Sequence, residues 1–213
     1  MEKPFCATIP DGTRLIETFG WWPEEGARRW PLHLARLRAS AARLGFALDG
    51  ARAEAIVAGI EADHPLRCRL TLDAGGGLDL TSAALGATPA RWRVGLADAR
   101  LNSGDDWLGV KTTQRALYDA ARAALPAGLD ELFFLNERGE ICEGTITSVF
   151  AELAEGRRVT PALACGLLPG VLRETLLRDG WQEGVITPAD LATARAIFAG
   201  NSLRGLIAVD WLA

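Results

Sequence analysis

Helix-like and strand-like patterns alternate along this chain of 213 residues, and the alternation restricts it to a mixed α/β fold. The clearest helical stretch begins at Pro31, and a helix is predicted over 31–46 because apolar residues recur at helical spacing at Leu34, Leu37, Ala41 and Leu44. A second helix is predicted over 49–62. Strand patterns, bounded by turns that contain Gly or Pro, cover 13–19, 66–73, 78–82 and 92–98.

The second half of the chain repeats this alternation after residues 101–109, whose Asn, Ser, Gly and Asp content makes them the best linker candidate. Helices are predicted over 112–125, within 166–180 with Gly180 as its end, and from Thr187-Pro188. Strands are predicted over 131–135 and 144–153, joined as a hairpin by the turn at 136–139, and over 195–200 and 204–211. We therefore expect a mixed α/β (α+β) protein with two lobes, 1–104 and 105–213.

The composition favours a globular protein and excludes several classes. Hydrophobic residues make up 49% of the chain, enough for a sizeable core, and the net charge of −4 disfavours nucleic acid or an anionic membrane as the main partner. No run of the sequence approaches the ~20 apolar residues of a membrane span, and the N-terminus lacks the apolar core of a secretory signal. We therefore expect a soluble cytoplasmic protein.

Cysteine and histidine give no pattern for a metal site or a hydrolase. The four cysteines are scattered without a C-x-x-C pair, which predicts reduced, partly buried thiols at Cys6, Cys68, Cys142 and Cys165. The chain has two histidines, too few for a convincing metal site, and no G-x-S-x-G motif. We expect no metal.

The scarcity of lysine singles out one amine. Only two of the 23 basic residues are lysines, Lys3 and Lys111, and Lys3 lies in an N-terminal segment that is expected to be frayed. Lys111 follows an apolar run at a predicted helix start, where partial burial would disfavour the charged form of its amine and make it a Schiff-base former. The alternative is a lysine at an exposed helix edge.

Two further features supply a carboxylate and an anion site. Glu143 enters a strand of small and β-branched residues, where a buried carboxylate needs a partner; alternatively, it is a solvent-exposed glutamate at a hairpin edge. Residues 166–177, GLLPGVLRETLL, place Pro-Gly before a helix whose N-terminal N–H groups can bind phosphate, although an ordinary helix-initiating turn has the same pattern. Arg36 could add a guanidinium fork to a phosphate.

An amine, a carboxylate and phosphate-binding groups are the set that pyridoxal 5′-phosphate requires. Its aldehyde binds a lysine, its ring nitrogen is held protonated by an acid so that the ring accepts electrons, and its phosphate needs donors. The combination indicates an enzyme that uses this cofactor.

Ordered motifs from about Leu15 to Trp211 resemble those of fold-type-IV pyridoxal phosphate enzymes, the class IV aminotransferase family. The motifs are LIETF, HLARLRASAARLGF, KTTQRALYDAAR, FLNERGEICEGTITSVF, GLLPGVLRETLL and NSLRG. The family includes branched-chain and D-amino-acid aminotransferases and 4-amino-4-deoxychorismate lyase. The resemblance implies a small α/β lobe, a larger pseudo-barrel lobe that carries the cofactor lysine, a cofactor between the lobes, and a homodimer whose sites borrow partner residues.

The resemblance also implies roles for particular residues. Lys111 matches the catalytic lysine that binds the cofactor aldehyde, and Glu143 matches the acid beside the pyridine nitrogen. Thr147 matches a small hydroxyl residue near the cofactor. The arginine of the family's E-T-x-R motif is replaced by Gly20, so Arg115 and Arg204 become candidates for binding the substrate carboxylate.

The resemblance further assigns the phosphate site. Arg36 matches the phosphate-binding arginine of an H-x-x-R-L helix, and Ser202 matches a hydroxyl that caps the phosphate. The backbone amides that receive the phosphate are matched by those of Val171 and Leu172.

Within the family, K-T-T-x-R-x-x-Y and N-S-L-R-G are most similar to the aminodeoxychorismate lyase side. The resemblance therefore implies release of pyruvate and 4-aminobenzoate in folate biosynthesis, with an aminodeoxychorismate synthase component as a candidate partner. Two alternatives are an aminotransferase that acts on branched-chain or D-amino acids, and a non-catalytic member that keeps the fold as a binding module. Intact Lys111 and Glu143 argue against the non-catalytic alternative.

Overall fold

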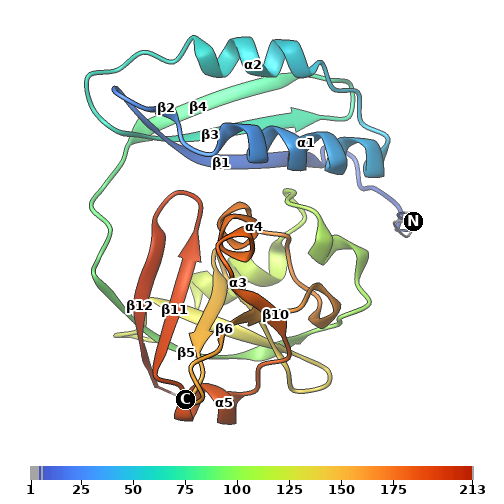
Figure 1. Ribbon diagram of the computed structural model, residues 1–213. Coiled ribbons are helices and arrows are strands. Elements are labelled where there is room, and N and C mark those ends of the chain that lie inside the picture. The colour runs from blue at the N-terminus through green and yellow to red at the C-terminus, as the bar shows by residue number, and fades with distance from the viewer. Residues whose placement is uncertain (1–4, 6, 213) are drawn as a thin grey trace. The chain divides into compact units, whose positions relative to one another are not determined.

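The computed structural model describes residue 5 and residues 7–212, and the chain divides into two compact units (Figure 1). Unit 1 comprises Met1–Ala87 with Val110–Gln114, and unit 2 comprises Thr88–Gly109 with Arg115–Ala213. The division differs from the boundary expected at residue 104, because 88–109 contribute a strand to the sheet of unit 2 while 110–114 pair with the first strand of unit 1. The candidate lysine, Lys111, therefore belongs to the smaller unit, whereas the larger lobe was expected to carry it.

Unit 1 is a four-stranded antiparallel sheet, in the order β2-β1-β3-β4, with two helices packed on one face. Its strands are β1 (Arg14–Trp22), β2 (Gly26–Ala27), β3 (Leu66–Asp73) and β4 (Leu78–Ala84). Helix α1 (Trp30–Leu44) has Pro31 in its first turn and buries the four apolar residues whose spacing predicted it. Helix α2 (Gly50–Ala58) is shorter than predicted and is capped by Asp49, whose side chain accepts a 3.0 Å hydrogen bond from the N–H of Arg52.

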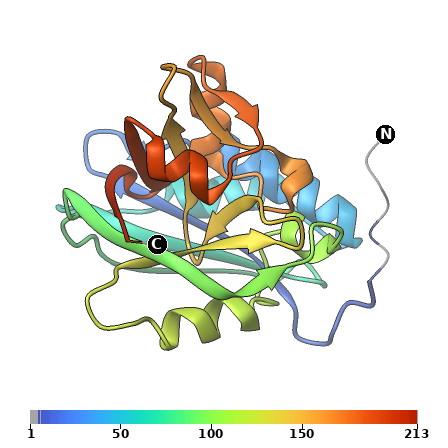
Figure 2. The ribbon, with the colours of Figure 1, turned by 90° about the horizontal axis from the view of Figure 1, so that it is seen from below.

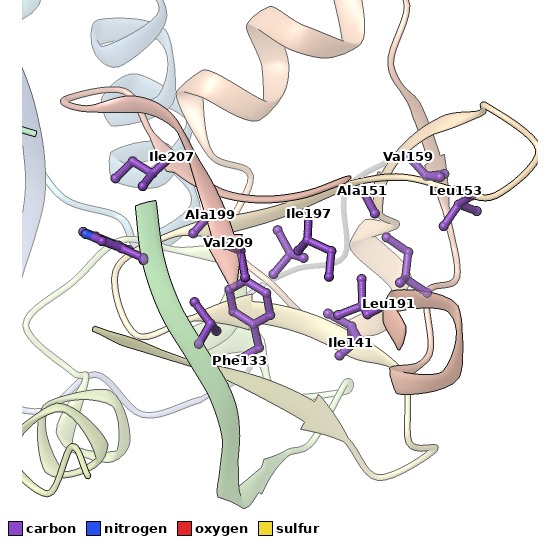
Figure 3. Close-up of a cluster of buried hydrophobic side chains, with 14 of the residues drawn as sticks. Phe133, Ile141, Ala151, Leu153, Val159, Leu191, Ile197, Ala199, Ile207 and Val209 are labelled. Carbon is purple, nitrogen blue, oxygen red and sulfur yellow. The ribbon is translucent and has the colours of Figure 1, made fainter. Parts of the chain in front are cut away.

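Unit 2 is built on an eight-stranded sheet in the order β10-β9-β8-β11-β12-β5-β6-β7, and a further pairing of β7 with β8 closes the strands from β8 to β7 into a ring. The strands are β5 (Arg91–Leu101), β6 (Glu131–Asn136), β7 (Ile141–Gly144), β8 (Ser148–Glu152), β9 (Arg158–Pro161), β10 (Gln182–Gly184), β11 (Ala196–Asn201) and β12 (Gly205–Trp211). Many of their apolar side chains form one large core cluster, which includes Phe133, Ile141, Ile197 and Val209 (Figure 3). The expected mixed α/β fold with a barrel-like sheet is confirmed.

Helices α3 (Ala116–Ala123), α4 (Val171–Arg178) and α5 (Pro188–Thr193) flank the strands of unit 2. Figure 2 shows α3 (yellow-green) beside the long strand β5 (green), and α3 also packs against β6. Gly180 follows α4 at a φ of 90°, and Thr187 caps α5 with a reciprocal Thr187–Asp190 capping box, so both predicted helix boundaries are confirmed. Short 3-10 turns span Asp106–Gly109 and Leu163–Cys165.

Three predictions for the chain between residues 101 and 153 were wrong. The helix predicted over 112–125 begins at Ala116, because the residues before it run extended beside β1. The strand predicted over 144–153 is interrupted by a turn at 145–147, which a buried carboxylate from β6 holds in place. Residues 101–109 are not a linker, because they complete β5 and form a 3-10 turn inside unit 2. The short strands β2, β9 and β10 were not predicted.

Within the described part of the chain, no helix is both long enough and apolar enough to span a membrane. Cys68, Cys142 and Cys165 are buried free thiols, as predicted. Lys3 and Cys6 lie outside the described residues.

Candidate active site

Lys111 lies in an extended segment of unit 1 that is hydrogen-bonded to β1. The N–H of Ile16 donates to the carbonyl of Lys111 at 2.8 Å, and the N–H of Thr113 donates to the carbonyl of Arg14 at 2.9 Å. The lysine is half-buried and does not lie at a helix start, since α3 begins at Ala116. Pairing with β1 therefore fixes the backbone of the candidate lysine.

A buried acid–arginine–histidine cluster links β1 to α1 in the same unit. Glu17 is 1% exposed and accepts two hydrogen bonds from Arg36, at 2.9 Å from Nε and 2.6 Å from Nη2. Nδ1 of His33 lies 2.6 Å from the same carboxylate. Arg36 was predicted to bind a phosphate. Glu17, which holds the guanidinium of Arg36 in one orientation, was not predicted as a site residue. The signal was present in the sequence: a glutamate within a buried strand needs cationic or donor partners.

The electrostatics of this cluster keep Glu17 ionised and His33 neutral. Burial by itself would raise the pKa of Glu17, but the charge of Arg36 and the hydrogen bonds from His33 and Arg36 outweigh it and lower the pKa to about 2. Burial lowers the pKa of His33; Glu17 opposes this effect, and the charges of Arg36 and Lys111 reinforce it. Neutral His33 therefore donates a hydrogen bond from its Nδ1–H to the Glu17 carboxylate. The charge of Lys111 acts on His33, so the lysine interacts electrostatically with this cluster.

Glu143 stands near the end of β7 in unit 2 and is 8% exposed. Its Oε1 accepts a 2.5 Å hydrogen bond from the hydroxyl of Tyr118 in α3, and its Oε2 accepts a 3.2 Å bond from the N–H of Leu168. Hydrogen bonds to a carboxylate favour its ionised form. The burial excludes the alternative of a solvent-exposed glutamate at a hairpin edge.

The turn that follows Glu143 is organised by a second carboxylate, Glu131, which the sequence analysis missed. Glu131 is completely buried and accepts hydrogen bonds from the N–H groups of Thr145, at 3.0 Å, and Ile146, at 3.2 Å. It also accepts from the hydroxyls of Thr145, at 2.5 Å, and Thr147, at 3.1 Å. Thr147, expected near the cofactor, therefore uses its hydroxyl to hold the turn. An acid at the head of the apolar strand ELFFL was the available signal.

Helix α4 begins at a close approach to β8 that requires glycine. A Cβ atom on Gly170 would lie 2.6 Å from Oγ of Ser148 in β8. The helix also approaches β11 closely, because a Cβ atom on Gly200 would lie 2.8 Å from Cδ2 of Leu172. Because the N-cap residue of α4 is Gly170, it supplies no capping side chain to the first-turn N–H groups, which include those of Val171 and Leu172. Such a helix start can receive an anion.

Ser202 lies in the turn between β11 and β12 and is buried. The side chain of Asn201 organises this turn, because its Oδ1 accepts from the N–H groups of Leu203, at 3.1 Å, and Arg204, at 3.0 Å. Its Nδ2 donates to the carbonyl of Ile146 at 3.2 Å, so the turn that carries Ser202 is bonded to the turn that follows Glu143.

Arg115 and Arg204, the candidates for binding the substrate carboxylate, have different surroundings in unit 2. Arg115 donates from Nε to Asp119 at 2.7 Å and from Nη2 to the carbonyl of Thr145 at 3.0 Å, so its guanidinium is engaged by protein oxygens. Arg204 is partly exposed in the turn beside Ser202.

Hydrogen bonds and close contacts thus gather four parts of unit 2 into one neighbourhood: Glu143, the turn at 145–147, the start of α4 and the turn at 201–205. A buried carboxylate suits a protonated ring nitrogen, and amide donors at a helix start suit a phosphate, so these residues fit pyridoxal 5′-phosphate. Unit 1 holds the other two candidates, Lys111 and Arg36.

Comparisons with known proteins agree on one family. A family model described as amino-transferase class IV matches residues 14–211. The chain is similar to the crystal structure of a provisionally named amino-acid aminotransferase from Mesorhizobium loti, with 44% identity and a TM-score of 0.87 over 94% of this chain and 100% of that one. It is also similar to 4-amino-4-deoxychorismate lyase from Pseudomonas aeruginosa, with 25% identity and a TM-score of 0.81 over 97% of this chain and 88% of that one.

Similarity to the curated lyase of yeast is confined to part of each sequence. Aminodeoxychorismate lyase from Saccharomyces cerevisiae is 30% identical over 135 residues, which cover 54% of this chain and 36% of the yeast protein. The chain therefore spans about a third of the length of this relative.

Proposed function

Because this chain belongs to the class IV amino-transferase family of enzymes, we propose that it uses pyridoxal 5′-phosphate to cleave 4-amino-4-deoxychorismate into pyruvate and 4-aminobenzoate. The observation that carries the cofactor is the buried Glu143 carboxylate, held by two donors in the same unit as a helix start that can receive an anion. Similarity to the lyases of P. aeruginosa and S. cerevisiae supports the lyase reaction.

The residues of unit 1 hold the cofactor at its aldehyde and its phosphate. Nζ of Lys111 would hold the aldehyde, and Arg36 would hold the phosphate with a guanidinium that Glu17 orients. Lys111 is the one lysine among the described residues, so no other side chain there offers a primary amine.

In unit 2, the proposed contacts are to the ring nitrogen and to the phosphate. Glu143 accepts a hydrogen bond from the protonated ring nitrogen. The N–H groups of Val171 and Leu172 and the hydroxyl of Ser202 donate to the phosphate. Thr147 supports this site through the turn that it forms with Glu131.

The reaction is an elimination that needs no second substrate. When bound, the cofactor supplies a conjugated ring that accepts the electron pair left on the substrate carbon. The substrate amine would first replace Nζ of Lys111 at the cofactor aldehyde, which frees Nζ as a base. The freed Nζ would then remove the proton from the ring carbon that bears the amine, while Glu143 would hold the proton on the pyridine nitrogen. The bond from the neighbouring carbon to the enolpyruvyl oxygen then breaks, the enol takes up a proton to become pyruvate, and the remaining ring is the aromatic 4-aminobenzoate. Arg115 and Arg204 are the candidate partners of the substrate carboxylates.

The test supplies 4-amino-4-deoxychorismate to the purified full chain with the cofactor and without any oxo acid. We expect equal amounts of pyruvate and 4-aminobenzoate, and loss of both with Lys111→Ala. Absence of pyruvate from the unaltered protein, with cofactor bound, would overturn the lyase reaction.

An aminotransferase is the second candidate function, and the similarity to the M. loti protein at 44% identity favours it. The same residues would serve, with Lys111 moving the substrate proton. Branched-chain and D-amino acids, offered singly and then with an oxo acid, distinguish the two, because only an aminotransferase requires the oxo acid for turnover. A protein that binds no cofactor would contradict both candidates and favour a non-catalytic member of the family.

A further inference from the structure

Tyr118 and Glu143 form a short hydrogen bond in unit 2 that the proposed reaction does not use. The hydroxyl of Tyr118, on α3, donates to Oε1 of Glu143, near the end of β7, at 2.5 Å. Tyr118 is the one tyrosine of the chain. This contact therefore joins a unique side chain to the acid proposed to hold the cofactor ring.

The ring of Tyr118 is held in place by contacts that do not involve its hydroxyl. It packs edge-on against the fully buried ring of Phe134, with centroids 5.2 Å apart, and the guanidinium of Arg115 lies 5.7 Å from its centroid. A Tyr118→Phe variant therefore keeps the packing and removes only the donor.

The hydroxyl acts as a donor throughout the working pH range. Burial, followed by the charge and the hydrogen bond of Glu143, raises the pKa of Tyr118 far above its usual value. The phenol therefore keeps its proton, and Glu143 is the acceptor in this pair.

We propose that Tyr118 is a positioning residue, whose hydroxyl orients the Glu143 carboxylate and stabilises it as an anion for the protonated ring nitrogen of the cofactor. The N–H of Leu168 restrains the other carboxylate oxygen at 3.2 Å, so both oxygens are oriented by the protein. An acceptor that is already ionised and oriented needs little reorganisation when a cationic ring binds. This inference rests on the proposed cofactor and adds Tyr118 to the residues that support it.

Other ionisable groups of unit 2 surround this pair. Cys142 precedes Glu143, and burial raises the pKa of its thiol to about 12, so it stays neutral. Arg115 lies over the tyrosine ring, and Arg122 pairs with Glu131 at 3.7 Å beneath the neighbouring turn. A Tyr118→Phe variant leaves all of these groups unchanged, so its effect on cofactor binding reports the lost hydrogen bond.

The experiment titrates pyridoxal 5′-phosphate into the cofactor-free full chain between pH 5 and 8 and compares the unaltered protein with Tyr118→Phe, Glu143→Gln and the double variant. We expect Tyr118→Phe to raise the Kd for the cofactor about tenfold, because it removes a hydrogen bond to a charged group. We call the low-pH range in which the Kd rises as pH falls the acid limb of the affinity profile. In Tyr118→Phe the acid limb should move to higher pH, since a carboxylate without its donor takes up a proton more readily. With Glu143→Gln, Tyr118→Phe should add little, because the two residues act together.

The matched control is Thr160→Val, which removes a buried hydroxyl that donates at 2.8 Å to the carbonyl of Val149, outside this hydrogen-bond set. It should lower stability while the Kd and the acid limb stay unchanged. A second measurement replaces Tyr118 by 3-fluorotyrosine, which biosynthetic incorporation places at this one position. A more acidic phenol is a stronger donor, so the acid limb should move to lower pH, and the fluorine resonance should shift when the cofactor binds.

The outcomes separate the two proposals. Unaltered protein that binds no pyridoxal 5′-phosphate would overturn the proposed function. Unaltered protein that binds it, together with an unchanged Kd and acid limb in Tyr118→Phe and in the fluorotyrosine protein, would overturn the inference alone. An equal loss of affinity from Tyr118→Phe with and without Glu143 would also overturn it, because the tyrosine would then act independently of the acid.

Discussion

The carboxylate of Glu131 accepts a 2.5 Å hydrogen bond from the hydroxyl of Thr145, a residue 14 positions later in the chain. This contact, with the backbone bonds to Thr145 and Ile146, reverses the chain immediately after Glu143. The reversal lets β8 pair with β7 and so closes the barrel at Glu143, the acid proposed to face the cofactor ring. Glu131, which takes no part in the proposed reaction, thus helps to determine the position of Glu143, which does.

The first prediction concerns this carboxylate. Glu131→Gln keeps the side-chain volume but replaces one acceptor oxygen by an NH2 group, which cannot accept from the surrounding donors. The free energy of unfolding, measured by urea denaturation, should therefore fall by about 2–4 kcal/mol. Glu155→Gln is the control, because Glu155 is half-exposed and pairs with Arg157 at the surface; it should leave the free energy of unfolding nearly unchanged. Equal effects of the two variants would contradict this account of the turn.

A second prediction concerns pH and Glu17. Its pKa in the folded protein is about 2, below the value of 4.5 that serves for the unfolded chain. The Glu17 carboxylate, ionised beside Arg36 and hydrogen-bonded by neutral His33, therefore contributes stability that is fully present above about pH 5 and is lost as pH falls from about 4.5 toward about 2. The shift corresponds to about 3 kcal/mol. Denaturation between pH 3 and 7 should show this loss.

The variant Glu17→Gln should be less stable at pH 7 and should lose much of the acid dependence, because the group that titrates is gone. Glu25→Gln removes an exposed partner of Arg28 and should leave the acid dependence as it is. A profile for Glu17→Gln that runs parallel to that of the unaltered protein would exclude Glu17 as its source.

A third prediction concerns the chemistry of the lysines. Borohydride reduction makes the bond between an amine and an aldehyde permanent, so reduction in the presence of pyridoxal 5′-phosphate should label the peptide that contains Lys111. Mass spectrometry after proteolysis locates the label. Lys3 provides an internal comparison, since it is the one other lysine of the chain. Labelling that persists in Lys111→Ala would reject Lys111 as the cofactor lysine.

A fourth prediction tests the close approach at α4. Gly170→Ala places a Cβ atom 2.6 Å from Oγ of Ser148 and should displace the helix start, raising the Kd for the cofactor about tenfold or more. Adding Ser148→Ala removes the clashing oxygen and leaves the Ser148 Cβ position, which lies at 4.0 Å, so affinity should recover in the double variant. No recovery would mean that the spacing between β8 and α4 does not control binding.

The sequence carried strong local signals for some elements and for the types of chemical group. Helix α1 is where its apolar spacing and Pro31 predicted it, and β3 matches its predicted range of 66–73. In both elements the spacing of apolar residues that predicts the structure lies within the element itself. The amine of Lys111 and the acid of Glu143 could be singled out because lysine is scarce and because a carboxylate in an apolar strand needs partners.

The errors occurred where a distant partner decides the structure. The segment around Lys111 has local helix-forming neighbours, yet its hydrogen bonds go to β1, about a hundred residues earlier. The segment 144–153 reads as one strand, yet Glu131 turns it at 145–147. Tyr118 gave no local sign of its contact with Glu143, because α3 and β7 meet only in the folded unit.

By itself, then, the sequence determined the mixed α/β class, the periodic elements and the few side chains able to carry an amine or a buried acid, since composition and spacing are local properties. Only the tertiary structure decided that Glu17 orients Arg36, that Glu131 shapes the turn and that Tyr118 donates to Glu143. Buried charges must find their donors wherever folding brings them, and those donors lie on other elements of the fold.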